Sequence, residues 1–419
     1  MNIEEAKEYM IQSGVLGSIL GLERMQCLCD SLGNPEDDLD FVHVAGTNGK
    51  GSTVAFISSI LKAAGIKTGM YYSPALCGIK DHFMIDGCLI SDEEYAELVG
   101  ELKEADSKVL EKIGSNATQF ELETALAFMY FSRNKCQAVV LETGLGGLTD
   151  ATNIVKNKLA CVFTSISYDH MAILGNSLSE IAGVKSGIIT SDCPIIAFDS
   201  GDEVIAAISD KCKETGSELT VVSTCDKDYF DKLGVTLSLK GSYQNDNAKL
   251  AVETIKKLCK LNVSEEAIKI GLETAKWPFR YEQISLSPLI YLDGAHNPDA
   301  ARRLKESVEN DFRNRKIIFV IGMFKDKEYE KVISTLTPLA NSVYTLTTPD
   351  NPRALEGAVI GEIARRDCSS VTVCQLVKEA ALGAINEARE NSDAVVIAFG
   401  SLSYLNDFKE AVVDILANG

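Results

Sequence analysis

Residues 43–53, HVAGTNGKGST, place three glycines, a lysine and a Ser–Thr pair directly after a short apolar stretch. A strand, a glycine-rich turn and a helix N-terminus together form an anion site, because backbone N–H groups and the helix dipole point at the anion. Lys50 would bring a positive charge to the outer phosphates of a nucleotide, and Ser52 or Thr53 could reach a metal ion. The segment therefore predicts a phosphate-binding loop.

The spacing of this loop differs from the usual phosphate-loop pattern. Gly46 lies only three residues before Gly49, and Gly51 separates Lys50 from Ser52. The pattern G-x-x-x-x-G-K-[ST] is not met, so a glycine-rich turn with a purely structural role stays as the alternative. The apolar strand before the loop and the amphipathic helix after it favour the phosphate site, because such a site requires both.

Two polar residues at predicted strand ends could work with this loop. Glu142 ends the apolar stretch QAVVLE, and a carboxylate at the C-terminal end of a central strand lies beside the phosphate loop of an open α/β sheet. Mg²⁺, which ATP-handling sites need, takes such oxygen ligands. His170, in TSISYDHMAILG, also follows a strand end, although a histidine here is more often an ordinary loop residue.

A similar strand end occurs in the second half of the chain, in YLDGAHNPDAARRL. Asp293 ends a predicted strand, and His296 precedes a helix whose start is marked by Asn297, Pro298 and Asp299. These residues form either part of a site or an ordinary strand–turn–helix connection, for which Asp, Gly, Asn and Pro are standard. The residues alone leave both readings open.

The elements that must position these side chains alternate between strands and helices, which indicates an α/β fold with parallel sheets. In the first part we expect a helix at 52–65 and strands at 41–46, 67–72, 137–142, 159–167 and 194–198. The stretch 218–240 is richer in β-branched residues and turns. We expect a small antiparallel insertion there.

A second series of strands is expected at 289–294, 316–324, 342–348, 371–375 and 394–400. Helical segments separate them, as in an independent doubly wound domain. At 419 residues the chain is too long for one ordinary core. We therefore expect two domains, residues 1–286 and residues 287–419.

Composition excludes several classes of protein. The net charge of −19 argues against a nucleic-acid partner, because phosphate contacts need clustered Lys and Arg. No apolar run approaches the length of a membrane span, and the acidic N-terminus, MNIEEAKEYM, does not have the pattern of a signal peptide. The twelve cysteines are scattered without a CxxC pair, so we expect reduced, mostly buried thiols in a cytoplasmic protein.

Six segments occur in an order that resembles folylpolyglutamate synthases and dihydrofolate synthases of the Mur-ligase superfamily: HVAGTNGKGST, TQFELETALAFMYF, ETGLGGLTDATN, DHMAILGNSLSEIAGVKSGII, WPFRYE and LDGAHNP. The resemblance covers essentially the whole chain. It implies an N-terminal P-loop-type ATPase domain and a C-terminal, Rossmann-like glutamate-ligase domain. It also implies a reaction in which ATP converts a carboxylate into an acyl phosphate, which the amine of L-glutamate then attacks.

The resemblance also implies roles for individual residues. The ATP contacts would be Asn48, Gly49, Lys50, Gly51, Ser52, Asn247, Arg280 and Asp293. The Mg²⁺ ligands would be Ser52, Ser73, Glu142 and His170, and a monovalent cation is a further expected ion. The residues at the reacting groups would be Lys50, Lys185, Asp293 and His296. The acid substrate and glutamate would contact Thr118, Gln119, Phe120, Glu121, Asp150 and Ser401, with residues 118–121 on the pterin side.

Lys185, in GVKSGII, matches a lysine that the family carries as a carbamate. That modification would turn a cation into an anion able to orient a metal. The alternative is an unmodified lysine paired with phosphate, and the sequence does not separate the two. The resemblance further implies a monomer whose partners are the small molecules ATP, L-glutamate and a folate or dihydropteroate.

Departures from the family pattern concentrate where the acid substrate is expected. Residues 73–83 read SPALCGIKDHF, with Ala75 in place of a histidine, and with Asp81, His82 and Phe83 where Glu, Arg and Ile are usual. The usual Arg-Leu-Asp after GLGG is replaced by Leu-Thr-Asp at 148–150. The rival hypothesis is therefore a ligase that joins an amino acid to a different carboxylic acid.

Two further hypotheses concern the chain as a whole. A nucleotide-binding regulatory protein without turnover is disfavoured, because Lys50, Glu142, His170, Lys185 and Asp293 are all present. Domain closure is expected, with Asn247 and Arg280 on one side of ATP and Asp293 on the other.

Overall fold

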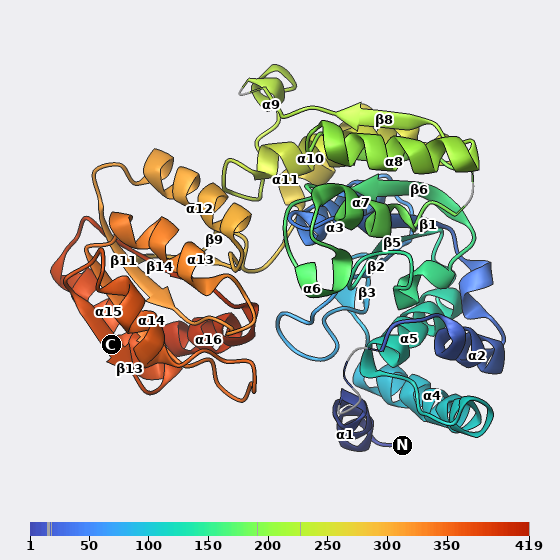
Figure 1. Cartoon of the computed structure of the whole chain (residues 1–419), viewed down its shortest axis with the longest axis horizontal. Helices are drawn as coiled ribbons and strands as arrows, with labels where there is room; N and C mark the ends of the chain where they lie inside the picture. Colours follow the sequence, from blue (N-terminus) through green and yellow to red (C-terminus); the bar gives the residue numbers. More distant parts are fainter. Residues whose placement is uncertain (15–16, 18, 191, 227, 419) are drawn as a thin grey trace. The chain divides into compact units, whose positions relative to one another are not determined.

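The computed structural model describes residues 1–419 apart from residues 15–16, 18, 191, 227 and 419. The chain forms two units, each with its own β-sheet (Figure 1). The first unit comprises residues 1–238 and 245–276, and the second comprises residues 239–244 and 277–419. The domain boundary between residues 286 and 287 stays a prediction.

The sheet of the first unit has eight strands in the order β4-β3-β2-β5-β1-β6-β7-β8. Their bounds are β1 (Phe41–Ala45), β2 (Thr68–Tyr71), β3 (Met84–Ile85), β4 (Cys88–Leu89), β5 (Ala138–Glu142), β6 (Lys158–Phe163), β7 (Ile195–Phe198) and β8 (Leu219–Val222). The pairs from β2 to β8 are parallel, whereas β3 pairs antiparallel with both β2 and β4. Strands β1 and β5 are buried on both faces. Their sequences are therefore mostly apolar and do not alternate between apolar and polar residues.

Helices cover this sheet on both faces (Figure 1). One group packs with Phe41, Tyr71 and Leu141 in a shared core: α1 (Ile3–Ser13), α2 (Glu23–Leu32), α4 (Asp92–Ile113) and α5 (Gln119–Arg133). On the other face α3 (Lys50–Ala63) lies against β1, β2 and β5, and α11 (Glu265–Thr274) lies against α3. The remaining helices are α6 (Met171–Leu174), α7 (Leu178–Ser186), α8 (Asp202–Thr215), α9 (Tyr229–Lys232) and α10 (Gln244–Lys257), and short 3₁₀ turns span Pro35–Asp38 and Ala151–Ile154.

The sheet of the second unit has six strands in the order β13-β12-β11-β14-β10-β9. They are β9 (Glu282–Leu286), β10 (Leu289–Asp293), β11 (Lys316–Ile321), β12 (Ser342–Leu346), β13 (Val371–Cys374) and β14 (Ala394–Phe399). In this sheet β9 runs antiparallel to β10, and the other neighbouring strands pair in parallel. The helices are α12 (Pro298–Asp311), α13 (Tyr329–Leu336), α14 (Gly357–Ala364), α15 (Val377–Glu390) and α16 (Leu402–Asn418), with a 3₁₀ turn at Thr337–Leu339.

The predicted α/β class is confirmed, and each strand expected between residues 41 and 198 and between 289 and 400 is present within a few residues. The expected position of the antiparallel part is wrong. Leu219–Val222 pairs in parallel with β7, while the antiparallel strands of the first unit lie at residues 84–89. Propensity at 218–240 indicated a strand correctly, but it does not determine strand direction, which follows from the neighbour in the sheet.

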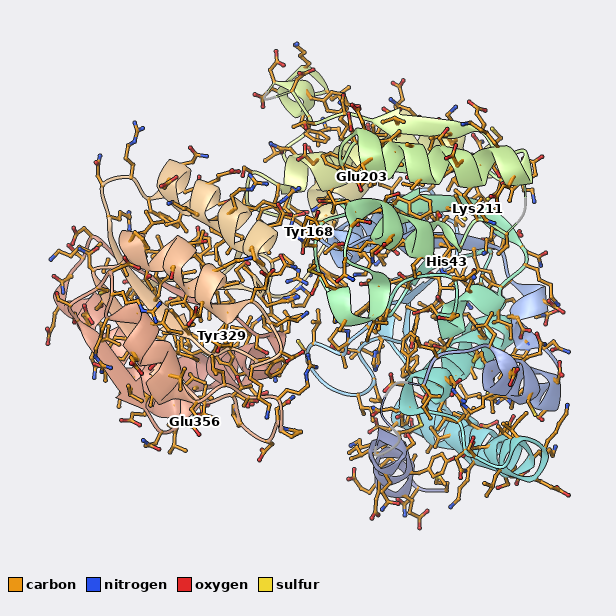
Figure 2. The ribbon with its side chains drawn as sticks, viewed as in Figure 1. His43, Tyr168, Glu203, Lys211, Tyr329 and Glu356 are labelled. Atoms are coloured by element: carbon orange, nitrogen blue, oxygen red, sulfur yellow. The ribbon has the colours of Figure 1, made fainter. Side chains whose placement is uncertain are left out.

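Eight of the twelve cysteines are buried, and all twelve are free thiols, as expected. None of the helices in the described part of the chain combines the length and the apolar character that a membrane span requires. His43, which is labelled in Figure 2, lies on the central strand β1 and is completely buried. Its Nε2 lies 2.9 Å from Thr152 Oγ1, and burial lowers its pKa well below the usual value. We read it as a core histidine.

Candidate active site

The loop between β1 and α3 requires glycine at two positions. A Cβ atom on Gly46 would lie 1.9 Å from Thr164 Oγ1, and one on Gly49 would lie 2.3 Å from Asn247 Oδ1. Gly49 also has a φ of 91°, which favours glycine. The unusual glycine spacing therefore has a steric cause, and the structure brings Asn247 against the loop.

Hydrogen bonds fix the loop to the segment that follows β6. The amides of Thr47 and Asn48 donate to the carbonyl of Ser165 at 2.8 and 3.2 Å. Thr47 Oγ1 donates to the Ser167 carbonyl at 3.1 Å, and Asn48 Nδ2 lies 3.5 Å from Ser167 Oγ. The first helical hydrogen bond runs from the Thr53 amide to Gly49, so the amides of the first turn point out of the N-terminus of α3.

Lys50 and Glu142 face each other beside this helix end. Their Nζ and Oε1 atoms are 3.6 Å apart, and the register of β1 and β5 places Glu142 next to Val44. Glu142 is 5% exposed, and a carboxylate so deeply buried needs a partner. Ser52, which is also buried, lies in the first turn of α3. A carboxylate and a hydroxyl are ligand types that Mg²⁺ prefers.

Lys185 projects from α7 into the same region. Its Nζ donates a hydrogen bond of 2.8 Å to the carbonyl of Gly46. Burial and, to a lesser extent, the nearby positive charge of Lys50 lower the pKa of Lys185 to about 7, and the charges of Asp169 and Asp150 partly oppose this shift. A considerable fraction of this side chain is therefore an uncharged amine at neutral pH.

The other predicted metal ligands lie at loop positions. Ser73 directly follows β2 and Tyr72 and is half-buried. His170 precedes α6, with a φ of 50° and Nε2 3.9 Å from Asp169 Oδ1. Within the described residues, no three His, Cys, Asp or Glu side chains gather closely enough to hold a metal ion by themselves.

The residues predicted on the pterin side form the start of α5. Thr118 caps this helix, and the Glu121 carboxylate accepts from the Thr118 amide at 2.7 Å and from Arg24 Nε at 3.1 Å. Gln119 Nε2 donates to Glu123 Oε1 at 2.7 Å.

Asp150 and Phe120 belong to one neighbourhood. A Cβ atom on Gly144 would lie 2.5 Å from Phe120 Cζ, and Asp150 closes the loop that contains Gly144. The Asp150 carboxylate accepts from the amides of Leu145 at 2.7 Å and Thr152 at 3.0 Å. Burial raises the pKa of Asp150, which these hydrogen bonds oppose.

In the second unit, Asp293 ends β10 and is 4% exposed. Its Oδ2 accepts from Tyr243 Oη at 2.7 Å and from the Tyr281 amide at 2.9 Å, while Oδ1 accepts from the Ala295 amide at 2.8 Å. Burial raises the pKa of Asp293, and the positive charge of Arg280 lowers it. Arg280 thus lies beside Asp293 in the same unit, which differs from the expected placement of the two on opposite sides.

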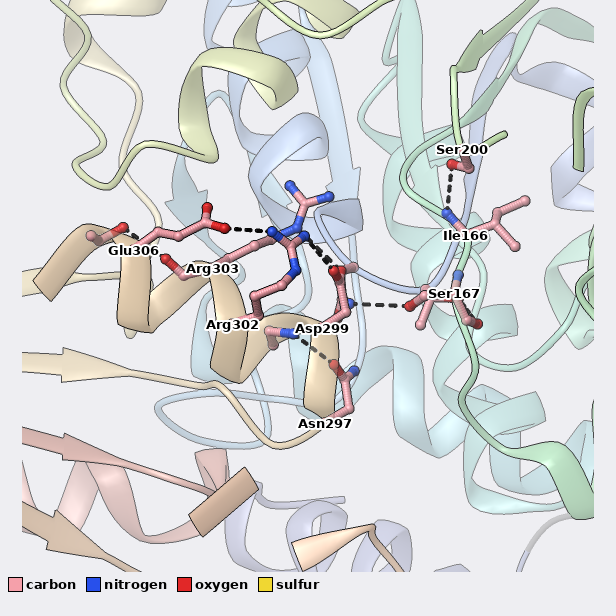
Figure 3. Close-up of polar contacts among 12 residues, drawn as sticks. Ile166, Ser167, Ser200, Asn297, Asp299, Arg302, Arg303 and Glu306 are labelled. Atoms are coloured by element: carbon pink, nitrogen blue, oxygen red, sulfur yellow. Dashed lines mark hydrogen bonds and ion pairs between the residues drawn. The ribbon is translucent and has the colours of Figure 1, made fainter. Parts of the chain in front are cut away.

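His296 and Ser401 also lie at helix starts of the second unit. His296 Nδ1 is 2.8 Å from the carbonyl of Gly294, and Asn297 Oδ1 accepts from the Ala300 amide at the beginning of α12. Arg302 and Arg303 both donate to Asp299 in the first turn of that helix (Figure 3). Ser401 Oγ lies 2.9 Å from Ser403 Oγ at the start of α16.

Three residues of the candidate site, Tyr243, Asp169 and Thr164, were not predicted from the sequence. Tyr243 binds Asp293 across 50 residues of chain, and only its closeness to Asn247 in SYQNDNAK could have drawn attention to it. Asp169 adjoins His170 in the sequence, which is a usable signal for a polar strand end. Thr164 gives no such signal, because its role depends on contact with Gly46.

Two domain families match almost the entire region that holds these residues. The Mur ligase middle domain matches residues 44–268, more than half of the chain, and the Mur ligase glutamate ligase domain matches residues 279–402. The dihydrofolate synthase/folylpolyglutamate synthase of Bacillus subtilis is 35% identical over 93% of this chain and 94% of its own. The chain belongs to the folylpolyglutamate and dihydrofolate synthase family of Mur ligases.

Other members of this family agree with the assignment. The folylpolyglutamate synthase of Lacticaseibacillus casei is 32% identical over 85% of this chain and 88% of its own. A structure of Escherichia coli FolC in complex with DHPP and ADP is 28% identical, with a TM-score of 0.84 over 100% of this chain and 98% of that one. The family and the fold expected from the sequence motifs are confirmed.

Proposed function

We propose that this Mur ligase joins L-glutamate to the carboxylate of a folate, of dihydropteroate, or of both. Its family makes it an ATP-dependent acid–amino acid ligase. The observation that carries the proposal is the pairing of Lys50 with Glu142, 3.6 Å apart, at the N-terminus of α3. Together with the full-length similarity to a relative named for both activities, this arrangement supports phosphate activation of a folate-type acid.

In the proposed reaction, a carboxylate oxygen of the acid attacks the γ-phosphorus of ATP, ADP leaves, and an acyl phosphate forms. The glutamate amine then attacks the acyl carbon, phosphate leaves, and the amine loses a proton. A carboxylate is a poor electrophile, so phosphorylation supplies a leaving group. Residues 48–52 and Asn247 would hold the phosphates, with Lys50 neutralising the charge that develops on them.

The buried carboxylate of Glu142 and the hydroxyl of Ser52 fit a hard cation. With Ser73 and His170 they would hold Mg²⁺, which neutralises phosphate charge when bound. We also propose a carbamate on Lys185: carbon dioxide adds to the uncharged amine and one proton leaves. The lowered pKa of Lys185 supports this, because only the uncharged amine adds carbon dioxide. A monovalent cation is part of the same proposal.

The second unit would contribute Arg280 and Asp293 to ATP, and His296 and Ser401 to glutamate or the reacting groups. These contacts require the two units to meet around the substrates, so domain closure is proposed. Solution scattering with and without ATP and acid substrate tests this, because identical profiles would contradict closure. We further propose a cytoplasmic monomer whose partners are small molecules and not nucleic acid or membranes.

The acid itself would lie against Thr118–Glu121 and Asp150. The altered segment 75–83 favours one alternative: a ligase of the same mechanism that acts on a non-folate acid. ADP release with dihydropteroate, with tetrahydrofolate and with unrelated carboxylic acids, each with L-glutamate, decides between the two. If ADP is released with an unrelated carboxylic acid but not with dihydropteroate or tetrahydrofolate, the folate proposal is overturned.

A further inference from the structure

The last three residues of the altered segment 75–83 turn inward, whereas Cys77 and Gly78 face solvent. Asp81, His82 and Phe83 are only 6%, 2% and 0% exposed. Asp81 Oδ2 accepts from the amide of Leu76 at 2.7 Å, which folds the segment back on itself. Residues that differ from the family pattern are therefore packed inside the first unit, where they can act on neighbouring elements.

His82 lies between the end of β2 and helix α5. Its Nδ1 is 3.1 Å from the carbonyl of Tyr72, and its ring stacks on Tyr71 at 5.9 Å. Nε2 lies 4.0 Å from Glu123 Oε1 and has no hydrogen-bond partner among the described residues. Because Nδ1 faces a carbonyl, Nδ1 carries the proton and Nε2 is left as an acceptor directed toward Glu123.

Glu123 connects this histidine to the predicted substrate residues. It is 6% exposed on α5, and its Oε1 accepts from Gln119 Nε2 at 2.7 Å. The other end of the Gln119 amide is also constrained, because a Cβ atom on Gly14 would lie 2.6 Å from its Oε1. The side chains of His82, Glu123 and Gln119 thus form a continuous path from the strand end before Ser73 to the start of α5.

We propose that His82 and Glu123 are a positioning pair that, through Gln119, holds the start of α5 in the geometry that binds the acid substrate. This inference rests on the proposed function for the role of residues 118–121. It assigns a specific task to the altered segment: the uncharged His82 ring places its Nε2 acceptor 4.0 Å from Oε1 of Glu123, an apolar, buried setting that favours the protonated carboxyl group. The acid then binds well only while Glu123 is protonated.

Electrostatics supports this arrangement at neutral pH. Burial raises the pKa of Glu123 to about 7 and lowers the pKa of His82 to about 4. A neutral carboxyl group therefore faces a neutral imidazole below about pH 7. The other titratable groups that face Glu123 are Asp81, Tyr71 of β2 and Tyr95 of α4. None of these three is a cation, so a deprotonated Glu123 gains no compensating charge from them.

The test compares wild type with Glu123→Gln, which mimics the protonated carboxyl group, from pH 6 to pH 8.5. In the wild type, KM for the acid should rise about fivefold between pH 7 and pH 8, because the competent state loses population. KM for ATP should not rise over the same pH range. Glu123→Gln should remove the rise and keep the KM of the wild type at pH 6. A rise that persists in Glu123→Gln, or one shared by ATP, would overturn the proposal.

The matched control is Glu94→Gln. Glu94 accepts from Asn134, the C-cap at the opposite end of α5, so this variant should retain the pH profile of the wild type. If it loses that profile, any carboxylate beside α5 suffices and the pair has no special role.

A second readout does not depend on the identity of the acid. Hydrogen exchange at residues 118–124, corrected for the intrinsic effect of pH, should accelerate above pH 7 in the wild type and not in Glu123→Gln. If exchange at residues 118–124 depends on pH in the same way in the wild type and in Glu123→Gln, the pairing is overturned, even if the enzyme is active on a folate. Absence of ADP release with both pteridine acids, with the expected exchange pattern present, would instead overturn the proposed function alone.

Discussion

Lys185 Nζ donates a hydrogen bond of 2.8 Å to the carbonyl oxygen of Gly46. This contact joins the buried face of α7 to the first glycine of the phosphate loop. Because burial lowers the pKa of Lys185 to about 7, the side chain is present as both amine and ammonium at neutral pH. The two forms have different chemistry, so pH and carbon dioxide should both affect the reaction.

Lys185→Arg keeps a cation but removes the amine that carbon dioxide can modify. We expect kcat to fall about a hundredfold or more, as for other lost electrostatic groups. Wild-type kcat, measured at saturating acid substrate, should increase from pH 6 to pH 8, since the fraction of uncharged amine increases as pH passes through the pKa of Lys185. ADP release with and without added bicarbonate, and NMR with ¹³C-bicarbonate, measure both effects. Lys213→Arg on the exposed face of α8 is the control. Full activity of Lys185→Arg would exclude a required carbamate.

Two alanine substitutions separate backbone strain from crowding at the phosphate loop. Gly49→Ala and Gly65→Ala both place a side chain at a φ above 70°, which costs about 1–2 kcal/mol. Only Gly49→Ala also meets Asn247, whereas nothing lies within 4 Å at Gly65. We expect both variants to lose stability, and Gly49→Ala alone to raise KM for ATP by about tenfold or more. An equal KM in the two would show that Asn247 does not contact ATP.

Glu142→Gln removes the charge that faces Lys50 while keeping the shape of the side chain. If Glu142 is a ligand of Mg²⁺, the concentration of Mg²⁺ needed for half-maximal ADP release should rise by about tenfold or more. Titration of Mg²⁺ at saturating ATP measures this. Glu253→Gln on α10, which pairs with Lys256, should leave the midpoint unchanged. If Glu142→Gln left this Mg²⁺ concentration unchanged, the Glu142 carboxylate would pair with Lys50 without binding Mg²⁺.

The strand ends and the glycine-rich loop could be predicted because their signals are local. QAVVLE and LIYLDG each combine an apolar run with a terminal acid, and the structure has strands ending at Glu142 and Asp293. The partners of Asp293 and Glu123 could not be predicted. Tyr243 and His82 reach them across 50 and 41 residues of chain, and such long-range contacts follow from packing and not from any periodicity.

Tyr243→Phe and Asp293→Asn probe the polar cluster of the second unit. Tyr243→Phe removes one hydrogen bond to Asp293 and should cost about 1 kcal/mol. Asp293→Asn should cost more, about 1–3 kcal/mol, because one amide oxygen cannot accept from the donors on both sides of the carboxylate. Trp277, the only tryptophan of the chain, lies in the second unit. Urea unfolding followed by its fluorescence therefore reports this unit. If Tyr243→Phe lost more stability than Asp293→Asn, this would contradict the assigned hydrogen bonds.

Glu123→Gln should change the pH dependence of the stability of the first unit. The pKa of Glu123 is raised to about 7 in the folded state, against about 4.3 in an unfolded chain. Stability linked to the protonated carboxyl group is therefore fully present below about pH 4 and is lost as pH rises to about 7. The loss should be about 4 kcal/mol, and Gln, which does not titrate, should not show it.

Urea unfolding at pH 5 and pH 8, followed by circular dichroism, measures this difference, with Trp277 fluorescence as an internal reference for the second unit. Relative to the wild type, Glu123→Gln should be more stable at pH 8 than at pH 5. The transition reported by Trp277 should be the same in both proteins at each pH, because Glu123 lies in the first unit. A stability difference that is constant with pH would show that Glu123 is already ionised in the folded protein at pH 5. It would also remove the protonated carboxyl group on which the pairing with His82 depends.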